Sequence, residues 1–218
     1  MTRLAPALLA ALPLSLGACS EQADRVGEEA GYQGGDRTGG QGASAMSPAA
    51  SALAERFDLA EPDLIIAPTT YRAQGDLSSG AGISVAVIEE ADPGHLRVSG
   101  SADPDAVLAN PGLGLSYRLS ADRTTAYAGQ TVIVTLVVRA AGEIGEDARP
   151  AIRAAWVAGP GMNSGWQEMV LTADWQKAVF TYAVPEAADP DPDHVVILPP
   201  EGGQAFDLAA LAVRPSAQ

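Results

Sequence analysis

From about residue 62 onward, the chain is a succession of short apolar runs separated by Gly, Pro, Asp and Asn. This spacing is typical of β-strands in a sandwich and leaves no room for a series of βαβ units. The sequence therefore predicts an all-β fold. Residues 131–139 are apolar on both faces, which predicts a strand in the middle of a sheet. The expected strands are 64–67, 83–88, 95–98, 113–119, 131–139, 152–157, 167–171, 176–184, 195–198 and 206–213.

Residues 1–18 have the pattern of a secretory signal peptide. Arg3 provides a positive start, and the apolar stretch 4–16 is too short to span a bilayer. The stretch ends in Leu16-Gly17-Ala18-Cys19, which resembles the lipobox of bacterial lipoproteins. The resemblance implies that Cys19, the single cysteine of the chain, carries acyl chains such as palmitate. The alternative is an ordinary secretory signal with an incidental cysteine.

The lipobox resemblance also predicts where the protein resides. Several acyl chains would anchor it to a membrane far more firmly than one. Ser20 follows the cysteine, which in lipoproteins suits sorting to the outer membrane. We therefore expect a lipid-anchored protein of the cell envelope, at the outer membrane, on its periplasmic or its surface face.

A tether is expected between the anchor and the folded part. Residues 19–52 are rich in Gly, Gln, Ser and Ala and have almost nothing to bury, a composition that stays disordered. A short helix is predicted at its end, with Ser47 as N-cap, Pro48 in the first turn, and Leu53 and Phe57 one turn apart. Residues 53–218 are assigned to the sandwich domain.

The composition excludes several functions. The chain has 13 Lys and Arg against 27 Asp and Glu, a net charge of −14, which argues against a nucleic-acid partner. One cysteine excludes an intramolecular disulfide framework and a cysteine-based zinc cluster. The two histidines, His95 and His194, lie in turn-like sequence and are expected at the surface.

The C-terminal half resembles the galactose-binding-like jelly roll, especially its carbohydrate-binding-module branch. The resemblance rests on three passages: Ala128-Gly129-Gln130-Thr131 before an apolar strand, Leu171-Thr172-Ala173-Asp174-Trp175-Gln176, and the closing strand from Phe206-Asp207-Leu208 to Val213. It implies a jelly-roll β-sandwich. Many such domains bind glycans, but others bind proteins or lipids, so the resemblance leaves the ligand open.

Sugars stack their C–H faces on indole rings, so tryptophans are the first candidate ligand residues. Trp166 follows the Gly- and Pro-rich loop 159–165 and is either a ligand residue or a residue at the edge of the core. Asn163 and Gln167 lie beside it and could bind hydroxyl groups. Trp156 and Arg153 would contribute to a groove on one sheet, although Trp156 alternates with apolar residues that suggest a core position.

A structural calcium ion is the one candidate cofactor. The resemblance implies that Asp207 is either a calcium ligand or a plain hydrogen-bond acceptor. The run 189–194 places three aspartates at alternate positions, but it lacks the glycine turn and final glutamate of an EF-hand loop. A solvated acidic loop is the simpler interpretation of that run.

No catalytic motif is found: there is no nucleophile elbow, phosphate loop, dinucleotide fingerprint or zinc-protease helix. We therefore expect a non-enzymatic protein. The sequence favours non-catalytic binding of a carbohydrate, such as an envelope or secreted polysaccharide. The alternative is a structural or assembly role, in which the sandwich docks an envelope protein.

Overall fold

The computed structural model describes residues 48–59, 64–66, 76–145, 148–186 and 191–216. The expected signal peptide (1–18), Cys19 and the expected tether up to residue 47 lie outside the described residues. The described residues belong to one compact unit, which includes residues 48–52.

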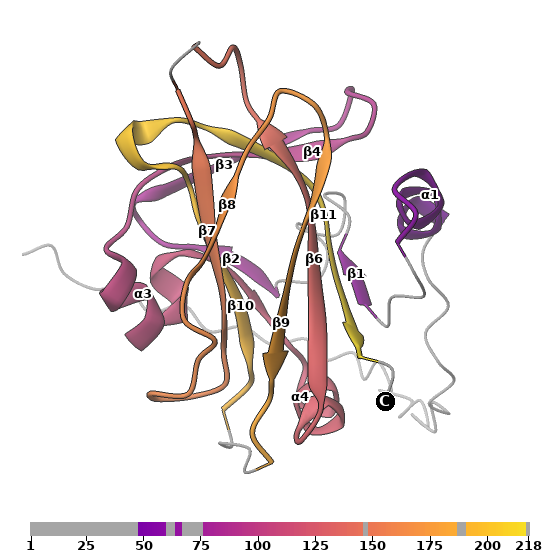
Figure 1. Cartoon of the computed structure of the whole chain (residues 1–218), viewed down its shortest axis with the longest axis vertical. Coiled ribbons are helices and arrows are strands. Elements are labelled where there is room, and N and C mark those ends of the chain that lie inside the picture. The colour runs from indigo at the N-terminus through magenta and orange to yellow at the C-terminus, as the bar shows by residue number, and fades with distance from the viewer. Residues whose placement is uncertain (1–47, 60–63, 67–75, 146–147, 187–190, 217–218) are drawn as a thin grey trace, which may run out of the picture. The chain divides into compact units, whose positions relative to one another are not determined.

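In the described part of the chain, the strands form two antiparallel sheets that face each other as a jelly-roll β-sandwich, which confirms the expected fold (Figure 1). Sheet A has the order β3-β4-β11-β6-β9, with β1 also paired to β11, and sheet B has the order β2-β5-β10-β7-β8. The strands of sheet A are β1 (Leu64–Ile66), β3 (Ile83–Ile88), β4 (His95–Gly100), β6 (Thr131–Ala140), β9 (Gln176–Ala183) and β11 (Phe206–Pro215). Those of sheet B are β2 (Leu77–Ser79), β5 (Leu115–Arg118), β7 (Ala151–Val157), β8 (Gln167–Val170) and β10 (His194–Leu198).

Each strand range expected from the sequence overlaps an observed strand, and the three-residue strand β2 was not expected. The strand predicted for the middle of a sheet, β6, lies between β11 and β9. Alternate residues of each strand point to opposite faces of a sheet. One face of each sheet therefore contributes to the core between the sheets, which includes Leu136, Trp156 and Phe206.

The outer face of sheet A is partly covered by α1 (Pro48–Arg56), which is the helix expected at the end of the tether. Ala50 and Leu53 of α1 pack against Val137 of β6 and Ala210 of β11. Two ion pairs flank this contact: Arg56 with Asp92, and Lys177 with Asp58 at 3.8 Å. In Figure 1, α1 lies on the side of sheet A that faces away from sheet B.

The outer face of sheet B is partly covered by α3 (Pro104–Ala109), followed by the 3₁₀ turn η2 (Pro111–Leu113). Val107 of α3 is completely buried against Ala155 and Val196. Asp103 caps this helix by accepting the backbone N–H of Ala106 at 2.8 Å. The remaining helical elements of the described residues are α4 (Ala121–Tyr127), which precedes β6, and the 3₁₀ turn η3 (Glu201–Gly203), which precedes β11.

None of the helices in the described residues is both long and apolar enough to cross a membrane.

We predict that Trp156→Ala lowers the free energy of unfolding by about 3–5 kcal/mol. The substitution opens a cavity in the core and leaves the buried carboxyl group of Asp193 without its indole hydrogen-bond donor. Trp156 has no solvent exposure, and its indole N–H donates to Asp193 Oδ2 at 2.9 Å. Urea denaturation measures the change. Val179→Ala is the control, since Val179 is 54% exposed and should cost less than about 0.5 kcal/mol. Equal stability losses in the two variants would contradict this assignment of the core.

Candidate functional site

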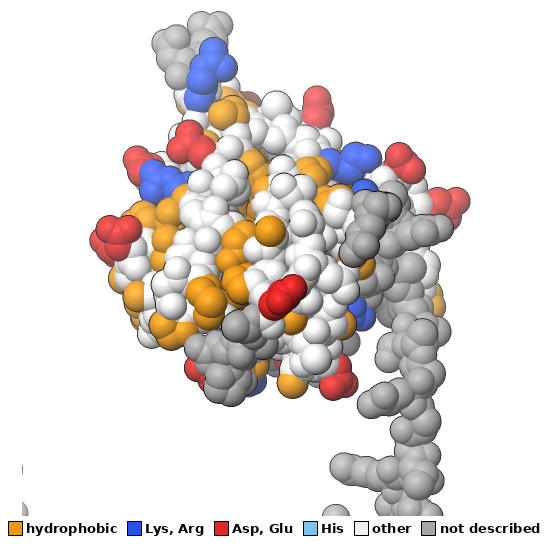
Figure 2. Space-filling view, turned by 60° about the horizontal axis from the view of Figure 1, so that its bottom comes forward, with side chains coloured by type: hydrophobic (Ala, Val, Ile, Leu, Met, Phe, Trp, Pro, Cys, Tyr) orange, Lys and Arg blue, Asp and Glu red, His pale blue; other side chains and the backbone are white. Residues whose placement is uncertain are grey.

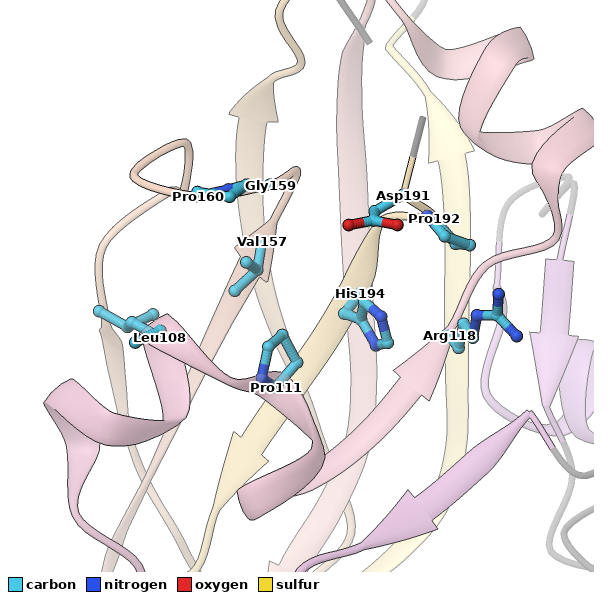
Figure 3. Close-up of a pocket in the computed structure, with 10 residues that line it drawn as sticks. Leu108, Pro111, Arg118, Val157, Gly159, Pro160, Asp191, Pro192 and His194 are labelled. Carbon is cyan, nitrogen blue, oxygen red and sulfur yellow. The ribbon is translucent and has the colours of Figure 1, made fainter. Parts of the chain in front are cut away.

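A hollow of about 280 Å³ opens on the outer face of sheet B, and we call it the His194 hollow. The α3–η2 segment forms one wall and the loop after β7 forms another, while the segment before β10 contributes Asp191 and Pro192 (Figure 3). Its lining residues are Leu108, Ala109, Pro111, Arg118, Val157, Gly159, Pro160, Asp191, Pro192 and His194.

Strand register brings together three of the lining residues. His194 of β10 pairs with Arg118 of β5 on one side and with Val157 of β7 on the other. Residues paired in this way point to the same face of a sheet, about 5 Å apart from strand to strand. Arg118, His194 and Val157 thus form one row across the sheet, and Figure 3 shows the imidazole between the other two side chains.

His194 is half-buried and is held by a second polar residue. Its Nδ1 hydrogen-bonds with Ser116 Oγ at 2.9 Å. Burial lowers the pKa of His194 below its ordinary value, and the positive charge of Arg118 lowers it further, while Asp191 acts in the opposite direction. The imidazole is therefore neutral at pH 7 and has one donor and one acceptor nitrogen.

The other polar groups of the hollow differ in charge. Arg118 is exposed, and its guanidinium group has no hydrogen-bond or ion-pair partner in the described part of the chain. Asp191 is exposed above the His194 ring, as Figure 3 shows. The hollow thus offers strong hydrogen-bond donors, a carboxylate acceptor and a neutral ring, set among apolar and proline side chains. Such a lining suits a small polar ligand that has apolar faces.

The structure places the two tryptophans proposed as ligand residues in different surroundings. Trp156 is completely buried in the core, so its prediction as a sugar-binding residue is wrong. The reason is strand alternation, which places it on the inner face of β7 together with Ile152 and Ala154. Trp166 is half-buried and packs against the apolar cluster under α3, which contains Val157. Its indole nitrogen is buried and has no hydrogen-bond partner among the described residues.

The polar residues proposed with them do not line the His194 hollow. Asn163 and Gln167 stabilise the loop itself: Asn163 Oδ1 accepts the backbone N–H of Gly165 at 2.9 Å, and Gln167 Nε2 donates to the Ser164 carbonyl at 3.3 Å. Arg153 lies at the other end of β7 in an ion pair with Glu201, where it lines a separate hollow of about 270 Å³.

The calcium hypothesis for Asp207 is not supported by its surroundings. The carboxylate is completely buried and accepts hydrogen bonds from Arg97 Nε at 2.9 Å and Arg139 Nε at 3.0 Å. Cationic neighbours disfavour a metal ion, and the acceptor interpretation of Asp207 is correct. Over the residues that the structure describes, no group of three or more His, Cys, Asp or Glu side chains is arranged to hold a metal.

His95 and Asp193 were placed wrongly by the sequence analysis, which expected both at the surface. His95 is 1% exposed and hydrogen-bonds through Nδ1 with the Pro93 carbonyl, and His194 is half-buried. Asp193 is buried under Trp156, and burial raises its pKa, while the indole N–H acts in the opposite direction. Two loops singled out in the sequence, 159–165 and 189–194, do contribute to the hollow, but through Gly159, Pro160, Asp191, Pro192 and His194.

Comparisons with known proteins give structural likeness only. The chain is similar to the CBM22-1 xylan-binding domain from Paenibacillus barcinonensis Xyn10C, with a TM-score of 0.46 and 14% identity over 71% of this chain and 94% of that one. It is similar to the carbohydrate binding module CBM6cm-2 from Cellvibrio mixtus lichenase 5A in complex with cellotriose, with a TM-score of 0.40 and 12% identity over 71% of this chain and 98% of that one. At these TM-scores and identities, the likeness carries no argument about what this chain binds. No protein-family model matches the chain, and no curated protein matches it.

We predict a pH dependence of stability that comes from His194. Its folded pKa is below that of the unfolded chain, about 6.5, so the unfolded state takes up the proton first as the pH falls. The contribution of His194 to the free energy of unfolding is therefore complete above about pH 6.5. It is lost as the pH falls toward the folded pKa, by at most about 1.4 kcal/mol per pH unit. Urea denaturation between pH 7.5 and about 5 measures the slope. His194→Gln should flatten it, and equal slopes in both proteins would contradict the assignment.

Proposed function

We propose that the sandwich binds carbohydrate without catalysis, in the His194 hollow. The observation that carries the proposal is the row of Arg118, His194 and Val157, which places a guanidinium group and a neutral imidazole beside an apolar side chain. Sugars have hydroxyl groups that need donors and acceptors and C–H faces that pack on apolar surfaces. Proline rings at Pro111, Pro160 and Pro192 would supply further apolar contact in the hollow.

The size of the hollow restricts the ligand. At about 280 Å³ it is at the lower limit of ligand pockets, which usually range from about 300 to 1,000 Å³. None of the described residues that line it is Trp, Tyr or Phe, so binding would rely on hydrogen bonds, aliphatic contacts and the His194 ring. We therefore expect recognition of a short part of a glycan, with a Kd of about 1 mM, or about −4 kcal/mol.

Two features of the hollow support binding without chemistry. Asp191 is the one carboxylate among its described lining residues, whereas a glycosidase needs two carboxyl groups on either side of the bond. Ser116, whose hydroxyl group hydrogen-bonds with His194, has no solvent exposure. The hydroxyl group therefore positions the imidazole and does not reach a ligand.

We predict that Arg118→Ala weakens oligosaccharide binding about ten- to a hundredfold, because a hydrogen bond from a charged donor contributes about 1.5–3 kcal/mol. Neutral glucose, galactose, mannose and xylose oligomers are the probes. Trp166 packs against the buried cluster that contains Val157, a lining residue of the hollow, so tryptophan fluorescence is the readout for ligand binding. Arg149→Ala is the matched control, since Arg149 is an exposed arginine at the separate hollow.

The second candidate function, docking of an envelope protein, is favoured by a different observation. Strands β8 and β9 are edge strands of sheets B and A, and they expose Val170 and Val179 at 50% and 54%. Exposed apolar residues on edge strands are sites where another protein can add to a sheet. If none of the oligomers gives a saturable fluorescence change, carbohydrate binding in the hollow is refuted and docking becomes the better candidate.

The lipid anchor is part of the same proposal and rests on the sequence around Cys19. We predict that Cys19→Ser yields a precursor without acyl chains that leaves the membrane fraction, because the negatively charged chain has no electrostatic attraction to an anionic bilayer. Cell fractionation followed by mass spectrometry of the N-terminus measures both properties. Membrane association unchanged in the Cys19→Ser protein would refute the anchor.

A further inference from the structure

The outer face of sheet A carries a row of charged residues that the proposed function does not use. Asp207 of β11 pairs with Arg97 of β4 on one side and with Arg139 of β6 on the other. The three side chains therefore point to the same face, on the opposite side of the sandwich from the His194 hollow. No part of the proposed carbohydrate site contacts this row among the described residues.

Asp207 holds both arginines in fixed positions. Arg97 binds the carboxylate in a bidentate pair, with Nε 2.9 Å from Oδ1 and Nη2 3.1 Å from Oδ2, and Arg139 adds its Nε at 3.0 Å from Oδ2. Burial alone would raise the pKa of Asp207, but the hydrogen bonds from Arg97 and Arg139 and the charge of Arg97 oppose burial, and the pKa is lowered. The carboxylate is therefore ionised at neutral pH.

The row has more positive than negative charge. Arg97 alone would neutralise Asp207, and Arg139 adds a second guanidinium group. The imidazole of His95 lies close as well, with Nε2 3.3 Å from Asp207 Oδ2. Asp207 is the one carboxylate within ion-pair distance of either arginine in the described part of the chain. At least one positive charge thus remains uncompensated, in a protein whose net charge is −14.

The arginines keep hydrogen-bond donors that Asp207 does not use. Both terminal nitrogens of Arg139, and Nη1 of Arg97, have no hydrogen-bond partner among the described residues. The side chains of Arg139 and Arg97 are 31% and 46% exposed, so part of each side chain can be reached from solvent. Arg139 also makes a cation–π contact, in which its guanidinium carbon lies 4.5 Å from the ring centroid of Trp175.

We infer that Arg97 and Arg139 form a binding site for an oxyanion group, a carboxylate or a sulfate on a ligand. Guanidinium groups bind planar and tetrahedral oxyanions through pairs of parallel N–H donors. Both groups are already held in place by Asp207 and Trp175, so little side-chain entropy is lost on binding. The inference is independent of the proposed carbohydrate site, because no described residue is common to the two sites.

The test is an NMR titration of the whole chain that follows the arginine Nε–Hε and tryptophan indole signals. The probes are sodium glucuronate for a carboxylate and sodium sulfate for a sulfate, with chloride used to keep the ionic strength constant. Glucose is the uncharged control. We expect saturable shifts at Arg97, Arg139 and Trp175 with at least one anion and none with glucose. The anion that saturates at lower concentration identifies the preferred group.

Arg139→Gln is the informative variant, because it removes the surplus guanidinium group and leaves the bidentate pair between Arg97 and Asp207 in place. We expect it to weaken anion binding at least about tenfold, as for loss of a charged hydrogen bond. Arg149→Gln removes an exposed arginine elsewhere and should bind as the unaltered protein does. Shifts that stay linear in anion concentration, or an Arg139→Gln protein that titrates like the unaltered one, would overturn the inference. Neither result would affect the carbohydrate proposal, which is tested by Arg118→Ala.

Discussion

The structure depends on the last strand, β11, which lies in the middle of sheet A although it comes last in the chain. It pairs with β6 over its whole length and with β4 and β1 on its other side. Residues 206–213 are all buried, because the core covers one face and α1 covers part of the other. Sheet A is therefore incomplete until the C-terminal residues have joined it, and these pairings connect distant parts of the sequence.

The burial of β11 on both faces also explains the row of charged residues formed by Arg97, Asp207 and Arg139. A strand covered on both sides should be apolar throughout, and the segment from Phe206 to Val213 follows that rule except at Asp207. An ionised carboxylate there needs partners, because an unpaired buried charge is costly. The neighbouring strands provide Arg97 and Arg139 at the paired positions. The result is a rigid pair of guanidinium groups on a sheet face where a single arginine would have balanced the charge.

The sequence predicted the strands well because period-two alternation is a local property. Helices α3 and α4 were missed although their caps are visible: Asp103 precedes Pro104, and Ser120 accepts the N–H of Arg123. The candidate site was not predictable in the same way. Arg118, Val157 and His194 lie on three strands far apart in the sequence, and only the strand register places them in one row. Trp156 was misassigned because an aromatic ring in a strand suits either face until the core is known.

The two outer faces of the sandwich differ in the chemistry that they offer. On sheet B, His194 is neutral at pH 7, and Arg118 and Asp191 line the same hollow, which we propose binds the hydroxyl groups of a sugar. On sheet A, Arg97 and Arg139 stay charged at any physiological pH and exceed the charge of Asp207. Figure 2 shows hydrophobic side chains in the middle of the face in view and most charged side chains around its outline. Because the overall charge is strongly negative, an anionic ligand would be repelled by most of the surface. The fixed arginine pair is the feature that could hold such a ligand against this repulsion.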